Sequence, residues 1–266
     1  MLLATWNVNS LKVRLPQVLD WLKANPVDVL GLQETKLTDD KFPVAAIEEA
    51  GYAVAFSGQP TYTGVAILSR RGTVGDPQGV QIGNPLFPDE QKRLISATVA
   101  GVRVVCAYFP NGQAVESDKY AYKLRWIDAL IDWLGPQIAA SGTQAADPRF
   151  ALLGDFNIAP GDADVHDPAA WAGQVLCSAP ERERFKRLID AGLVDAFRQF
   201  EQAPKTFSWW DYRQLGFRRN AGLRIDHILV DSTAAQRLRG CRVDREPRKL
   251  EQPSDHAPVI AELEIS

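Results

Sequence analysis

The segments GLRIDHILV (residues 222–230) and PSDHAPV (residues 253–259) are the most informative part of this chain, because each places polar site-type residues beside an apolar, strand-like run. Three earlier segments share the pattern: TWNVN (5–9), LQETK (32–36) and LLGDFN (152–157). A carboxylate or amide at the end of a buried strand is costly to remove from water. Five such segments therefore predict one polar site at one end of a sheet core.

The residue types in these segments favour one kind of chemistry. Carboxylates and amides, with one histidine expected in the site, suit a hard divalent cation and a phosphate group better than zinc or a nucleophilic triad. Taken alone, each acid is more often a helix cap or a turn residue. Glu34 is harder to explain in that way, because Glu is a poor turn residue and here follows an apolar run. Asp155 lies in Gly-Asp-Phe-Asn, where the glycine permits close approach of backbone or substrate.

The composition is that of an ordinary globular protein, with 266 residues, 45% hydrophobic and 24% charged. Lys plus Arg is 30 and Asp plus Glu is 33, so the net charge of −3 does not indicate a nucleic-acid binder. Basic pairs can still attract a phosphate backbone locally. These pairs are Arg70-Arg71, Lys92-Arg93, Lys186-Arg187, Arg218-Arg219 and Arg248-Lys249.

Three widely spaced cysteines argue against a disulfide framework or a cysteine metal site and agree with a reducing cytoplasm. The first residues lack the basic and apolar regions of a signal peptide. No segment approaches about 18 uninterrupted apolar residues, the length of a membrane span. We therefore expect a cytoplasmic protein with no membrane association.

Strands and helices alternate along the chain. Apolar runs predict strands at 2–8, 27–32, 52–56, 64–69, 94–99, 102–108, 150–153, 223–230 and 258–265, with 94–108 as a hairpin. Helical spacing predicts helices over 11–22, 44–50, 120–134 and 181–191. Gly and Pro predict a loop with one edge strand at 72–91, and small polar residues predict a loop at 141–148. We expect one domain over residues 1–266, of class α/β or α+β, in which NVN (7–9) and DFN (155–157) echo each other as if two halves share a plan.

Strand geometry gives an expectation for the 223–230 run. Side chains alternate between the two faces of a strand. Arg224 and Asp226 are therefore expected on one face, and Ile225 and His227 on the other, with His227 in a structural role. The adjacent acid and histidine of PSDHAPV lie between two prolines, which predicts a turn where both can converge.

The segments LQETK (32–36), LGDFNIAP (153–160), GLRIDH (222–227) and SDHAPV (254–259) resemble the exonuclease III family of DNA-repair nucleases, within the endonuclease–exonuclease–phosphatase fold. The resemblance runs from Met1 to the last strand and includes the less generic TFSWWDYR (206–213). It implies a four-layer α/β (α+β) sandwich of two packed, mixed β-sheets flanked by helices. It also implies a Mg²⁺ cofactor, for which Mn²⁺ can substitute, and hydrolysis of DNA phosphodiesters.

The resemblance gives metal-site roles residue by residue. Glu34 is similar to the family's principal metal ligand, with Asn7 and Asp255 in or near its shell. Asp155, Asn157 and His256 also match a second metal position found in the family.

It gives catalytic roles in the same way. Asp155 is similar to the residue that activates the attacking water, and Asn157 to its orienting partner. His256 would contact the scissile phosphate and Asp226 would orient it. Tyr108 resembles a tyrosine that contacts the phosphate. A histidine held by a carboxylate keeps one tautomer, and its protonated form is stabilised.

The expected partner is double-stranded DNA with abasic sites or 3′ ends. The resemblance places Trp209 and Leu223 at an apolar pocket for a base-free sugar, although aromatic residues also serve simply as core. Other substrate-binding candidates are Asn111, Arg213 and Arg224, with Arg218 and Arg219 as further basic residues of the Trp-rich segment. The implied activities are incision on the 5′ side of abasic sites and removal of nucleotides or blocking groups from 3′ ends. We expect a monomer without an obligate protein partner.

Two alternatives stay open beside a repair nuclease. One is a phosphatase of the same fold that acts on a small phosphoester such as an inositol phosphate, against which the segments 209–213 and 222–226 argue. The other is a non-enzymatic DNA-binding protein with a decayed site, against which the retention of every expected polar residue argues. The balance between the two nuclease activities, the number of metal ions, and the roles of Gln113 and residues 171–178 are left open.

Overall fold

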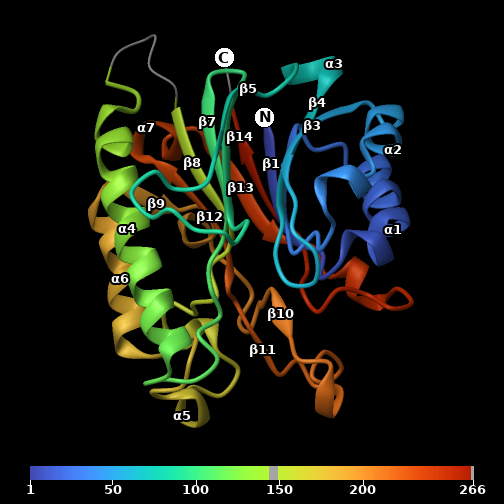
Figure 1. Ribbon diagram of the computed structural model, residues 1–266. Coiled ribbons are helices and arrows are strands. Elements are labelled where there is room, and N and C mark those ends of the chain that lie inside the picture. Colours follow the sequence, from blue (N-terminus) through green and yellow to red (C-terminus); the bar gives the residue numbers. More distant parts are fainter. Residues whose placement is uncertain (144–148, 265–266) are drawn as a thin grey trace.

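The structure is a computed structural model that describes residues 1–143 and 149–264. Two six-stranded mixed sheets pack face to face, and helices cover the outer face of each (Figure 1). The predicted α/β sandwich of two mixed sheets with flanking helices is therefore confirmed. No helix in the described ranges is long and apolar enough to cross a membrane.

The first sheet, sheet A, holds the first and the last strand that the structure describes. Across it lie β13 (Leu238–Val243), β14 (Val259–Leu263), β1 (Leu2–Asn7), β2 (Val29–Gln33), β4 (Val65–Arg70) and β3 (Tyr52–Ser57). Strands β1 and β2 are parallel, and their neighbours pair antiparallel.

The second sheet, sheet B, repeats this arrangement. Across it lie β5 (Gln78–Ile82), β6 (Leu94–Val99), β7 (Val102–Tyr108), β8 (Arg149–Asp155), β12 (Asp226–Asp231) and β9 (Leu193–Asp195). Strands β7 and β8 are its parallel pair. A separate two-stranded ribbon joins β10 (Trp209–Trp210) to β11 (Gly222–Leu223).

The longer helices cover the sheets and link the parallel strands. Helices α1 (Leu11–Ala24) and α2 (Val44–Glu49) pack on sheet A, while α4 (Asp118–Ala140) and α6 (Ala179–Asp190) pack on sheet B. Helix α1 connects β1 to β2 as α4 connects β7 to β8, so each half carries a parallel βαβ unit. The shorter helical elements are α3 (Arg71–Val74), α5 (Pro168–Trp171), α7 (Ser232–Ala235), and the 3₁₀ turns Asp39–Lys41, Asp162–Asp164, Phe197–Gln199, Arg213–Leu215 and Glu246–Lys249.

Alternation along the strands builds three apolar layers. In β1, Leu3 points between the sheets, whereas Ala4 and Trp6 point to α1. In β8, Leu153 points between the sheets, whereas Leu152 points to α4 and α6. Burial of these side chains is the dominant favourable term for such a sandwich.

Most predicted elements appear within a few residues of their expected ends. The hairpin at 94–108 is confirmed as β6 and β7, and the expected edge strand in 72–91 is β5, preceded by the short α3. Part of the predicted loop at 141–148 and the end of the predicted strand at 258–265 lie outside the described residues.

The single strand predicted at 223–230 is wrong. The chain leaves the β10–β11 ribbon after Leu223 and joins sheet B only at Asp226. Between the two strands, the hydroxyl of Ser208 accepts hydrogen bonds from the backbone N–H groups of Ile225 and Asp226, at 3.1 and 3.0 Å. A side chain thus replaces ladder partners at the break, and the face alternation expected across residues 224–227 does not apply.

Candidate active site

Side-chain parity places the polar residues between the sheets at one end of the sandwich. Asn7 follows Leu3 and Thr5 on the inner face of β1, and Asp155 follows Ala151 and Leu153 on the inner face of β8. Register aligns the strand ends, because Asp155 is the Cα partner of both Tyr108 and Asp226. The two sheets therefore contribute polar side chains to one place.

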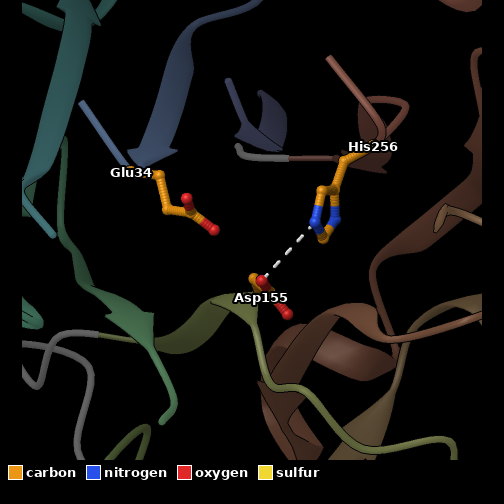
Figure 2. Close-up of side chains that lie close together, drawn as sticks. All are labelled: Glu34, Asp155 and His256. Carbon is orange, nitrogen blue, oxygen red and sulfur yellow. Dashed lines mark ion pairs between the residues drawn. The ribbon is translucent and has the colours of Figure 1, made fainter. Parts of the chain in front are cut away.

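Three of these side chains form the candidate metal site (Figure 2). Glu34, Asp155 and His256 each offer a ligand atom, and the three atoms lie within 4.8 Å of one another. They come from the end of β2, the end of β8 and the turn before β14. Among the described residues this is the group of acidic, histidine or cysteine side chains close enough to share an ion. Two carboxylates and one imidazole fit a hard divalent cation.

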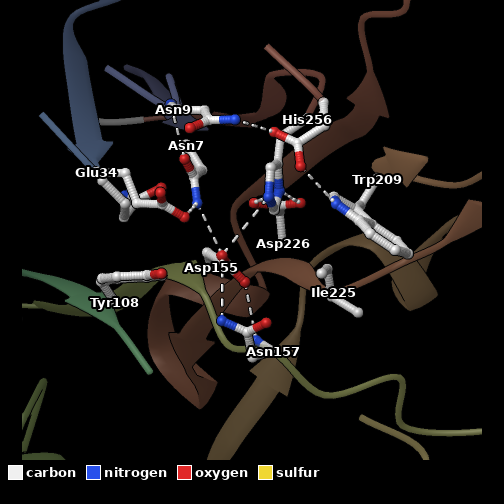
Figure 3. Close-up of polar contacts among 12 residues, drawn as sticks. Asn7, Asn9, Glu34, Tyr108, Asp155, Asn157, Trp209, Ile225, Asp226 and His256 are labelled. Atoms are coloured by element: carbon white, nitrogen blue, oxygen red, sulfur yellow. Dashed lines mark hydrogen bonds and ion pairs between the residues drawn. The ribbon is translucent and has the colours of Figure 1, made fainter. Parts of the chain in front are cut away.

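Asn7 joins the two carboxylates (Figure 3). Its Nδ2 donates to Glu34 Oε1 at 2.8 Å and to Asp155 Oδ2 at 2.9 Å, while its Oδ1 accepts from the backbone N–H of Asn9. Lys36 Nζ lies 2.9 Å from Glu34 Oε2 and partly neutralises that side of the site. Asn7 is thus brought to the site as a hydrogen-bond donor, and its role as a metal ligand stays a prediction.

Asp226 fixes the orientation of His256, and nearby carboxylates favour the protonated form of its ring. Its Nδ1 lies 2.9 Å from Asp226 Oδ2, and its Nε2 points toward Asp155 Oδ2 at 3.7 Å (Figure 3). Burial lowers the pKa of His256, but the charges of Asp226 and Asp155 outweigh it and raise that pKa to about 10. Ser208 donates to Asp226 Oδ2 at 2.6 Å and so holds the carboxylate in turn.

Asp155 and Tyr108 also depart from their ordinary protonation. Burial raises the pKa of Asp155 to about 7, against the opposing charge of His256, and the charge of Asp226 adds to the rise. Burial, with the charges of Glu34 and Asp155, raises the pKa of Tyr108 well above its usual value. Tyr108 therefore keeps its proton and can donate it in a hydrogen bond, whereas Asp155 is poised to exchange a proton near neutral pH.

Asn157 and Asn111 form a second layer of support. The backbone N–H of Asn157 donates to Asp155 Oδ1 at 2.9 Å, and its Nδ2 lies 3.3 Å from Asp155 Oδ2. Asn111 Nδ2 donates to Asn157 Oδ1 at 3.0 Å. Glu34 and Asn157 both adopt left-handed backbone, with φ of 53° and 50°. Such strain in non-glycine residues clusters at functional sites.

Asp255 lies beside this group and not within it. Its Oδ1 accepts from Asn9 Nδ2 at 3.0 Å, and its Oδ2 accepts from the indole Nε1 of Trp209 at 2.9 Å. Both carboxylate oxygens of Asp255 therefore accept hydrogen bonds from protein donors. The place of Asp255 in or near the metal shell stays a prediction.

The predicted apolar pocket residues lie together. Trp209 and Leu223 are Cα partners in the β10–β11 ribbon and share a small cluster with Ile225, Leu176 and Cys177. Leu223 is fully buried and Trp209 is half-buried, so of the two only Trp209 has exposed side-chain surface that a ligand could contact. Their contact with a sugar stays a prediction.

The assignment of Arg224 to DNA binding is wrong. Its guanidinium is buried and pairs with Asp164 at 2.7 Å and Asp195 at 2.8 Å, and it also contacts His227 Nδ1. The break after Leu223 turns the side chain into the fold and away from Asp226. Arg213, by contrast, is exposed and paired with Asp211, and its contact with DNA stays a prediction.

His227 is structural, as expected. Its Nδ1 contacts the guanidinium of Arg224, which can only donate, so Nε2 carries the proton and donates to Ile158 O at 2.9 Å. Burial, and then the charge of Arg224, lowers the pKa of His227 to about 4.

Two supporting residues were missed from the sequence. Ser208 holds both Asp226 and the break before it, and Lys36 links Glu34 to Asn9, at 2.5 Å from Asn9 Oδ1. Both lie in segments already singled out, TFSWWDYR and LQETK. The usable signal was their position in the sequence. Ser208 lies between two large aromatic residues, and Lys36 lies two residues after a candidate metal ligand.

Comparisons with known proteins agree with this geometry. Residues 4–256 match the group described as the Endonuclease/Exonuclease/phosphatase family. Exodeoxyribonuclease III of Haemophilus influenzae is 35% identical over 272 residues, spanning 97% of this chain and 98% of that relative. The chain belongs to the exonuclease III/AP endonuclease family.

Solved structures of the exonuclease III/AP endonuclease family share the whole fold. The 3′-5′ exonuclease NExo from Neisseria meningitidis is 49% identical with a TM-score of 0.94, and a structure described as the 3′ phosphatase NExo from Neisseria, bound to product DNA hairpin, matches equally well. An AP endonuclease from Archaeoglobus fulgidus is 36% identical with a TM-score of 0.91. All three matches cover 100% of both chains. The chain is thus a hydrolase of the exodeoxyribonuclease III/AP endonuclease type, as the sequence predicted.

Proposed function

We propose that this enzyme is a Mg²⁺-dependent DNA-repair phosphodiesterase that removes nucleotides or blocking groups from 3′ ends of duplex DNA and incises DNA on the 5′ side of abasic sites. The observation that carries the proposal is the convergence of Glu34, Asp155 and His256 from three separate segments onto one point. The 3′-end activity has the stronger support, because the NExo structures at 49% identity are described as an exonuclease and a 3′ phosphatase. Abasic incision draws support from the AP endonuclease at 36% identity.

The residues present fit a divalent metal ion. Glu34 and Asp155 would hold it, whereas the protonated ring of His256 has no free lone pair and would act beside it. When bound, such an ion supplies positive charge against the phosphoryl oxygens. The donor set favours Mg²⁺ or Mn²⁺ because its carboxylate oxygens are hard ligands and no cysteine takes part.

The protein's own groups account for the rest of the chemistry. The imidazolium of His256, held by Asp226, places a positive donor next to the phosphate, and the protonated hydroxyl of Tyr108 supplies a second donor. Asp155 lies beside the point where the reaction would occur and accepts the proton of the attacking water. Asn157 holds Asp155 through its backbone N–H and its amide, so the carboxylate keeps one orientation.

A two-substrate assay tests the proposal. The enzyme with Mg²⁺ is given two labelled duplexes, one with a recessed normal 3′ end and one with an internal abasic analogue, and initial rates are compared. We expect cleavage of both, abolished by EDTA and restored by Mg²⁺ or Mn²⁺. Failure on both duplexes together with turnover of an inositol phosphate would replace this proposal with the small-phosphoester alternative.

A further inference from the structure

One buried charged group has no part in the chemistry above. Lys123 lies on the inner side of α4, and its side chain is 0% exposed. Its Nζ donates to Asn157 O at 2.7 Å, Asn111 O at 3.1 Å and Glu181 Oε1 at 2.5 Å. An ammonium group has three N–H donors, so each finds one acceptor and the charged form satisfies the whole arrangement.

The two carbonyls that Lys123 binds belong to the residues that hold Asp155. Asn157 contacts both oxygens of Asp155, and Asn111 donates to the side chain of Asn157. Asn157 also adopts left-handed backbone, which persists only where the surroundings over-determine it. Lys123 contributes the hydrogen bond to the carbonyl of this strained residue.

Glu181 anchors the ammonium group from the other side. It is also 0% exposed, and it accepts hydrogen bonds from the backbone N–H groups of Leu176 and Ser178 at 3.0 and 3.1 Å. The Lys123–Glu181 ion pair thereby connects the segment 171–178 to the backbone of Asn111. The packing around Gly112 shows the same closeness of these segments. A Cβ added at Gly112 would lie 3.1 Å from Lys123 Cδ and 3.2 Å from Val175 Cγ2.

Burying an ion pair costs free energy of desolvation, and apolar side chains of similar volume often stabilise a fold as well or better. Apolar side chains could not, however, bind two backbone carbonyls as Lys123 does.

We propose that Lys123, with Glu181, is a positioning residue for the reaction: it fixes the backbone of Asn111 and Asn157 so that Asn157 holds Asp155 in its working orientation. The inference rests on the proposed function, because it presumes that Asp155 and Asn157 act on the substrate.

Three variants test the role. Lys123→Met with Glu181→Gln removes both charges without leaving one unpaired, and Lys123→Arg keeps the charge but changes the reach of its donors. Leu134→Ala is the matched control, because Leu134 is a fully buried residue of the same helix in the apolar layer under sheet B. Each variant is assayed on the recessed 3′-end duplex at saturating Mg²⁺, and the side-chain amide signals of Asn111 and Asn157 are followed by NMR.

The double variant should lose about 10²-fold in kcat, the effect of a small misplacement of a reacting group, while KM for DNA stays near the wild-type value. Both asparagine amide signals should shift. Lys123→Arg should fall between the wild type and the double variant, and Leu134→Ala should lose stability but keep kcat at temperatures where it is folded.

Wild-type kcat with unmoved amide signals in the folded double variant overturns the inference. Should the double variant not fold, wild-type kcat in Lys123→Arg overturns it as well. Asn157→Ala separates this inference from the proposed function. A severe loss in Asn157→Ala beside an unaffected Lys123 variant refutes only the positioning role, whereas failure of the wild-type enzyme to cleave the 3′-end duplex contradicts the proposed function itself.

Discussion

Asp226 Oδ2 lies 2.9 Å from Nδ1 of His256, across the gap between the two sheets. Both side chains are buried, and the bond leaves Nε2 of His256 facing Asp155. Asp226 belongs to sheet B, whereas His256 precedes the last strand of sheet A. This pair therefore depends on the docking of the sheets as well as on the chemistry of its members.

Asp226→Asn should lower the pKa of His256 toward its ordinary value of 6.5 from about 10. A histidine whose folded pKa is raised contributes stability that is fully present below pH 6.5 and is lost as pH rises toward 10. The difference in Tm between wild type and Asp226→Asn should therefore shrink over that range. NMR titration of His256 in EDTA measures the pKa directly. An unchanged value in the variant would contradict the assignment.

Glu34→Gln should keep the fold but weaken Mg²⁺ binding and collapse turnover, because an amide replaces the carboxylate that faces Asp155 and His256. Calorimetric titration with Mg²⁺ gives the affinity, and the 3′-end assay gives the rate. Glu48→Gln is the control, since Glu48 is exposed and pairs with Arg71 away from the site. Full activity of Glu34→Gln at low Mg²⁺ would remove Glu34 from the metal site.

Asp155→Asn should retain DNA binding and lose about 10²- to 10⁴-fold in kcat, the usual loss when a positioned general base is removed. Fluorescence anisotropy on a labelled duplex and single-turnover kinetics separate the two quantities. Asp162→Asn, an exposed acid paired with Arg182, serves as the neutral comparison. A variant that loses binding but keeps kcat would show that the role of Asp155 is misassigned.

Local arginines must supply the attraction of a chain with a net charge of −3 for DNA. Each phosphate neutralised contributes about −0.9 to the slope of log K against log salt, so about four contacts give a slope near −3 to −4. Replacing the exposed Arg218 and Arg219 together by Ala should flatten the slope and weaken binding to all sequences alike. Salt-independent binding by the wild type would instead favour the small-phosphoester alternative.

Arg224→Met should act on stability and not on the salt slope. The change leaves the carboxylates of Asp164 and Asp195 with one fewer partner, and breaking a buried ion pair typically costs about 3–5 kcal/mol. Chemical denaturation measures the loss. A flattened salt slope in a stably folded Arg224→Met protein would restore Arg224 to the DNA-binding surface.

The fold and the site segments could be predicted because both depend on local patterns. Apolar runs defined the strands, and parity within a run decides which side chain at its end points inward, as for Asn7 and Asp155. The limit is reached where pairing is not local. Nothing in the order of residues 222–230 shows that the chain changes sheets there, so the environment of Arg224 was misjudged.

Lys123 shows a second limit. The helix that carries it was predicted from its apolar spacing, but a lysine within that spacing is ordinarily assigned to solvent. Its burial is possible because Glu181 and the backbone carbonyls of Asn111 and Asn157 accept its three hydrogen bonds. These partners are far from one another in the sequence and come together only in the folded protein.

The division of the site between the two sheets has a consequence for how the enzyme is made. Asn7 and Glu34 leave the ribosome early, Asp155 and Asp226 follow much later, and His256 comes last of the set. No product that ends before residue 256 contains the whole set. A chain that stops before residue 256 therefore cannot assemble the candidate site, whatever the state of the rest of its fold.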